Sequence, residues 1–191
     1  EKYYYYNNYP ANIAILSDLL PFILFIFFAR SKKSIGLRVV FFIAVYSIII
    51  NFFIVPNRNW WALSFVIGRI STLVEFSLFS FFFFKVIESR IFKRGIFIVF
   101  PLTSAYLIYS LITSSNQSFG SGPSGLTATI FFIYCIFYLF EKVKDPASLF
   151  LYASPDFWVV VAIIIYSAGT FFPFIYAQNY IDKPDFENEY K

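Results

Sequence analysis

Residues 62–84 read ALSFVIGRISTLVEFSLFSFFFF, an apolar run that contains two charged side chains, Arg69 and Glu75. A helix rises about 1.5 Å per residue, so roughly 17 to 25 residues cross a hydrocarbon core of about 30 Å. The four consecutive phenylalanines at 81–84 do not show the alternating pattern of a transmembrane β-barrel strand. This run therefore predicts a membrane-spanning α-helix.

Other apolar runs of similar length occur along the chain. The six expected helices cover residues 11–29, 37–55, 62–84, 95–113, 123–140 and 157–177. The backbone N–H and C=O groups of a helix bond to one another, and lipid chains offer them no other hydrogen-bond partners. We therefore expect an all-α, polytopic transmembrane bundle over residues 1–178, followed by a polar tail at 179–191.

The composition of the 191-residue chain agrees with a membrane protein. Hydrophobic residues make up 59% of it and charged residues 14%, with a mean hydropathy of +0.69, whereas soluble domains average about 25% charged residues. The chain has no His, so His-ligated zinc or haem and Ser-His dyads are excluded within it, and the single Cys135 excludes an intrachain disulfide. We expect no cofactor, no metal site and no catalytic residue, and an enzyme is not the favoured class.

Basic residues are concentrated on one side of the expected bundle. The three odd-numbered connections carry ten of them: Arg30, Lys32, Lys33, Arg38, Lys85, Arg90, Lys93, Arg94, Lys142 and Lys144. The opposite side has Lys2, Arg58, Lys183 and Lys191. The positive-inside rule places the richer side in the cytoplasm, so we expect an inner (plasma) membrane protein with both ends of this piece outside.

This topology also bears on partners. It accounts for the net charge of +4, so nucleic acid is not an expected partner. The expected partner is the lipid bilayer. A cytoplasmic protein and a second copy of the chain stay open as further partners.

Three ionisable residues fall inside the expected helices, where each costs about 2.5 to 3.5 kcal/mol on insertion scales. Asp18 and Arg69 both lie roughly 10 Å below the outer surface and are placed to pair. Glu75 lies near the middle of its helix, on a face that it shares with Ser64, Gly68 and Ser71.

These charges allow three interpretations. They fix helix register, form a ligand or ion site, or act as a proton relay through Glu75. Packing is the simpler role for the aromatic residues that could line such a site, because they are so abundant. The possible lining residues are Tyr46, Tyr106, Tyr109, Tyr134, Tyr166 and Thr170. The candidate polar cluster consists of Asp18, Arg69, Ser71 and Glu75.

Three short segments carry a resemblance: TLVEF at 72–76, SPDFW at 154–158, and Ser17-Asp18 with Pro21. They resemble an uncharacterised family of bacterial multi-pass membrane proteins of about seven helices. The resemblance implies a seventh helix after Lys191, and it supports only Glu75 and Asp18 as candidate site residues.

The absence of any Met in the chain also leads us to expect a processed or partial sequence.

Short loops and the lack of a catalytic constellation favour a receptor or sensor-like module. Its small polar pocket would lie in the outer half of the bundle. The alternative is a small transporter or channel in which Asp18, Arg69 and Glu75 line the path. Broken helices at corresponding positions of two halves would favour the alternative, and we see none.

Overall fold

The computed structural model describes residues 34–54, 61–113, 121–144 and 151–181. Within these ranges the fold is all-helical, without a strand. The elements are α2 (Ile35–Ile54), α3 (Trp61–Val86), α4 (Arg90–Thr113), α5 (Ser121–Lys144), the short 3₁₀ helix η4 (Leu151–Ala153) and α6 (Pro155–Ile181). The expected helix at 11–29 lies outside the described residues, so the total of six stays a prediction.

The five described α-helices coincide with five expected apolar runs, and most extend beyond them. The largest difference at a single helix end is found in α4, which begins at Arg90 and not at residue 95. Hydropathy marks only the apolar part of a helix, whereas Arg and Lys are themselves good helix formers. α6 likewise continues to Ile181, so its last turn includes the first residues of the expected polar tail.

Three segments are long and apolar enough to cross a membrane: Val66–Val86, Arg90–Thr113 and Gly122–Lys144. Shorter apolar segments occur in α2 (Ile35–Ile50) and α6 (Pro155–Gly169).

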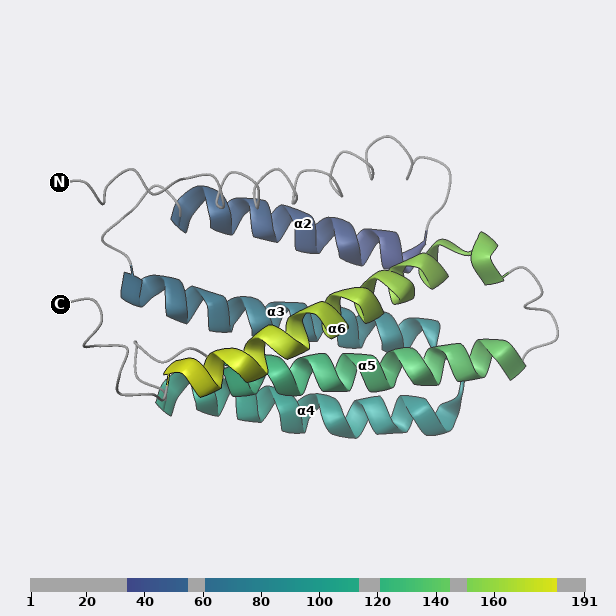
Figure 1. Ribbon diagram of the computed structural model, residues 1–191. Coiled ribbons are helices and arrows are strands. Elements are labelled where there is room, and N and C mark those ends of the chain that lie inside the picture. The colour runs from purple at the N-terminus through teal and green to yellow at the C-terminus, as the bar shows by residue number, and fades with distance from the viewer. Residues whose placement is uncertain (1–33, 55–60, 114–120, 145–150, 182–191) are drawn as a thin grey trace.

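The helices run up and down beside one another, with α3 in a central position (Figure 1). α3 contacts α2, α4 and α5, while α6 contacts α5 and α2. The starts of α2, α4 and α6 and the ends of α3 and α5 therefore lie at the same end of the bundle (Figure 1). We name this the basic end, after seven residues in or beside these helix ends: Arg38, Lys85, Arg90, Lys93, Arg94, Lys142 and Lys144.

Aromatic side chains form the core between α3, α4 and α5. The ring of Phe76 on α3 stacks on Phe100 of α4 and Phe131 of α5, with centroids 5.8 and 5.9 Å apart. Two turns further along α3, the ring of Phe83 lies against Tyr134 of α5. The buried α3 positions recur at the spacing of one helical face, so the core side of this helix is phenylalanine.

The outer face of α4 is also apolar. Ile91 is 77% exposed, Phe97 74% and Ile112 76%, so large hydrophobic side chains project along most of the helix. Soluble monomers rarely expose a contiguous apolar surface of this extent.

Candidate functional site

Two polar side chains of α3 contact two different neighbouring helices in the middle of the bundle. The hydroxyl of Ser71 lies 3.4 Å from the hydroxyl of Tyr46 on α2. The carboxylate of Glu75 accepts a hydrogen bond from the hydroxyl of Tyr166 on α6. α3 is therefore linked through polar groups to α2 at one position and to α6 one turn later.

Arg69 lies on another side of the same helix. At 100° per residue it projects about 160° from Ser71 and about 120° from Glu75. It falls on the face of Phe76, seven residues further on, which packs against α4 and α5. The side chain is 8% exposed. Of the four candidate residues, the structure places Ser71 and Glu75 on neighbouring positions of one face, and Arg69 on a different face.

The fourth candidate, Asp18, lies outside the described residues. Its expected ion pair with Arg69 therefore stays a prediction. The side chain of Ser64, which belongs to the expected small-residue stripe, is also outside the described part.

A carboxylate from α6 caps the start of α2 at the basic end. One oxygen of Asp156, Oδ1, accepts the hydroxyl of Ser34 at 2.5 Å and the backbone N–H of Gly36 at 2.9 Å. The hydroxyl oxygen of Ser34 in turn accepts the N–H of Leu37 at 3.3 Å. The first turn of α2 has no acidic residue of its own, and a helix N-terminus carries a partial positive charge. We call Ser34, Gly36 and Asp156 the Asp156 clamp.

Glycine is required at position 36 by this close approach. A Cβ there would lie 2.7 Å from Oδ1 of Asp156 and 3.0 Å from Cε2 of Phe82. The missing side chain lets the carboxylate reach the backbone of α2.

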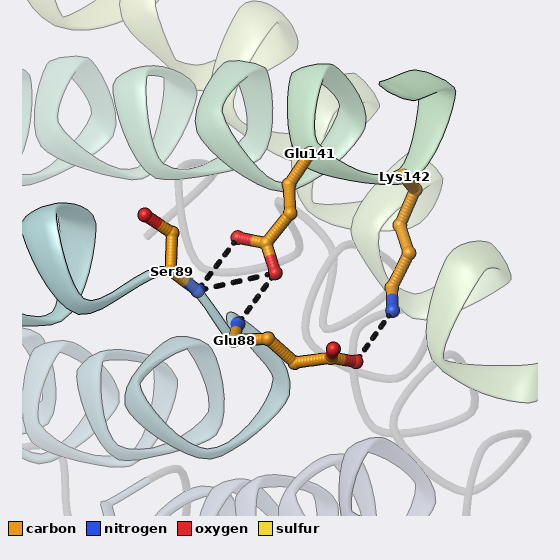
Figure 2. Close-up of polar contacts among 4 residues, drawn as sticks. All are labelled: Glu88, Ser89, Glu141 and Lys142. Carbon is orange, nitrogen blue, oxygen red and sulfur yellow. Dashed lines mark hydrogen bonds and ion pairs between the residues drawn. The ribbon is translucent and has the colours of Figure 1, made fainter. Parts of the chain in front are cut away.

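A second carboxylate caps the start of α4 (Figure 2). Oε1 of Glu141, on α5, accepts the backbone N–H of Glu88 at 2.6 Å, and Oε2 accepts that of Ser89 at 3.2 Å. Beside it, Nζ of Lys142 lies 2.9 Å from the carboxylate of Glu88. The first turn of α4 contains basic residues and no acidic one. We call Glu88, Ser89, Glu141 and Lys142 the Glu141 clamp.

Sequence reasoning did not single out either Asp156 or Glu141. A signal was present, because Ser34 and Ser89 precede helices whose first turns contain no acid. Such helix starts require an acceptor from elsewhere in the fold. Choosing which acid supplies it requires the packing of helices more than 50 residues apart in the chain.

The described residues contain no group of three or more His, Cys, Asp or Glu side chains that could hold a metal ion. Cys135 is buried, and its sulfur lies 3.8 Å from the carbonyl oxygen of Val160.

Comparisons of the chain with protein-family models, curated proteins and solved structures found no match.

Proposed function

We propose that this protein is a multi-pass integral membrane protein that works as a receptor or sensor-like module. The apolar outer face of α4 is the observation that carries the membrane part of the proposal. Exposing Ile91, Phe97 and Ile112 to water would be unfavourable, by about 25 cal/mol for each Å² of apolar surface, whereas lipid chains solvate them. Three helices of sufficient length and hydropathy support the same conclusion.

The charge distribution supports an orientation for this protein. The seven basic residues of the basic end lie together, as the positive-inside rule requires of a cytoplasmic face. We therefore assign the basic end to the cytoplasmic side of the plasma membrane. A cytoplasmic partner protein would meet the chain there.

The sensor role is supported by how the helices are linked. Glu75 connects α3 to α6 within the apolar part of the bundle, and the Asp156 clamp connects α6 to α2 at the basic end. A ligand or proton that changes the contact between Glu75 and Tyr166 would move α6. Because α6 holds the start of α2, the movement would reach the cytoplasmic side.

Distances between spin labels in lipid nanodiscs test this coupling. The labels are attached at Arg38→Cys on α2 and Arg94→Cys on α4, in a variant whose Cys135 is replaced by Ala. We expect Glu75→Gln, which removes the charge that accepts from Tyr166, to shift or broaden the distance distribution. Thr72→Ala is the matched control on α3, because the Thr72 hydroxyl donates to the carbonyl of Gly68 in its own helix, at 3.1 Å.

An unchanged distribution for Glu75→Gln would contradict the sensor role. If the same protein also released ions from sealed vesicles, and Glu75→Gln abolished that release, the transporter alternative would replace it.

A further inference from the structure

A groove runs between α3 and α4 on the outside of the bundle. Its deeper part is a cavity of about 260 Å³ whose lining is almost wholly apolar. The lining includes Phe81 and Phe84 from α3 and Ile96, Phe97 and Phe100 from α4, with Ser77 and Ser80 as the polar members.

A second hollow of about 410 Å³ lies beside this cavity, toward the basic end. Phe84 and Phe97 line both hollows, so the two are adjacent. The second is bordered by three cationic side chains, Arg90, Lys93 and Arg94. We call the two hollows together the α3–α4 groove.

The length of the groove corresponds to one leaflet of a bilayer. Phe100 lies ten residues beyond Arg90 in α4, which is about 15 Å along a helix and half of a hydrocarbon core of about 30 Å. One end is therefore charged at the depth of lipid headgroups. The other end is apolar at the depth of acyl chains.

Two acids beside the connection between α3 and α4 are engaged elsewhere. Glu88 pairs with Lys142, and Glu141 accepts backbone N–H groups of the connection between α3 and α4. Lys93 lies over the ring of Phe84, 5.7 Å from its centroid, within the groove. Among the described residues, no ion pair to an acid is found for Arg90, Lys93 or Arg94.

We propose that the α3–α4 groove binds one anionic phospholipid of the surrounding bilayer. Arg90, Lys93 and Arg94 hold its phosphate, and one acyl chain lies along Phe84, Phe97 and Phe100. Arginine forms paired, charge-assisted hydrogen bonds with phosphate oxygens, and basic pockets at the cytoplasmic ends of helices suit anionic headgroups. The apolar floor selects an intact lipid and not a free phosphate. This inference rests on the proposed membrane insertion.

Native mass spectrometry of the purified chain in micelles tests the proposal. The protein is titrated with phosphatidylglycerol and with phosphatidylcholine of the same acyl chains. We expect phosphatidylglycerol to bind more tightly, and Arg90→Gln with Arg94→Gln to weaken its binding roughly tenfold. The matched control is Arg38→Gln with Lys144→Gln, which removes the same charge from the same end and leaves that affinity within about twofold.

Two further results would each overturn the proposal. Equal losses of phosphatidylglycerol affinity in the two double variants would mean that binding depends on the net charge of the basic end and not on this groove. Displacement of the lipid by millimolar glycerol 3-phosphate would mean that the basic residues bind phosphate alone. A chain that leaves membranes on carbonate washing would instead refute the proposed membrane insertion, whatever it binds in micelles.

Discussion

The two clamps at the basic end both cap a helix start, but they differ in burial. In both, a carboxylate from another helix caps a helix start whose first turn has no acid. The Asp156 clamp is partly buried, joins residues 120 positions apart, and requires glycine at its contact point. The Glu141 clamp bonds to the connection between α3 and α4; its bond to Glu88 is exposed, whereas its bonds to Ser89 are partly buried. Burial strengthens such a bond, because water competes less for the polar groups.

The difference indicates what each clamp contributes. The Asp156 clamp closes the bundle by holding its first described helix to its last one (Figure 1). The Glu141 clamp orders a connection between two helices that already pack through aromatic rings, such as Phe76 on Phe100. We therefore expect the first clamp to matter for the arrangement of α2, and the second mainly for the local helix start.

Removing the two carboxylates should have unequal effects. Asp156→Ala leaves the Gly36 N–H and the Ser34 hydroxyl without their charged acceptor, and we expect it to lower the free energy of unfolding by about 2 to 3 kcal/mol. Glu141→Ala should cost about 1 to 2 kcal/mol, because one of its two backbone donors, the Glu88 N–H, is exposed and can bond to water instead. Unfolding by SDS in mixed micelles measures both. The comparison between the clamps fails if Glu141→Ala costs as much as Asp156→Ala.

A glycine substitution tests the depth of the Asp156 clamp separately. Gly36→Ala places a methyl group 2.7 Å from the carboxylate oxygen, and we expect a loss of about 1 to 3 kcal/mol from the resulting displacement. Gly95→Ala is the control, because nothing lies within 4 Å of a Cβ at that position of α4. Alanine favours a helix over glycine, so the control should be neutral or stabilising by up to about 1 kcal/mol. Equal effects in the same SDS titration would mean that position 36 is not crowded.

The helices of this fold could be predicted because apolar length is a local property of the sequence. The expected range 62–84 lies inside the observed α3 (Trp61–Val86). The expected start of α4 was five residues too late, because Arg90, Lys93 and Arg94 read as a loop on hydropathy while the helix begins at Arg90, directly after Ser89. Charge, capping and helix propensity together decide where such a helix begins, and hydropathy reflects only the charge.

The polar contacts could be predicted only as candidates. Ser71 and Glu75 stand out because polar groups are costly in an apolar helix. Their partners, Tyr46 and Tyr166, do not stand out among 15 tyrosines, because no spacing distinguishes them. Which tyrosine meets which polar group depends on the rotation of α2 and α6 against α3, which residue spacing within one helix does not reveal.

The smallest effect is expected from the ion pair in the Glu141 clamp. Lys142 is 20% exposed and its partner Glu88 76% exposed, so water and salt screen their attraction. We expect Lys142→Gln to lower the free energy of unfolding by no more than about 0.5 kcal/mol. The difference from the unmodified protein should vanish in about 1 M salt, where the Debye length is near 3 Å. A loss similar to that of Glu141→Ala, and insensitive to salt, would show that Lys142 supports the cap itself and that the Glu141 clamp acts as one unit.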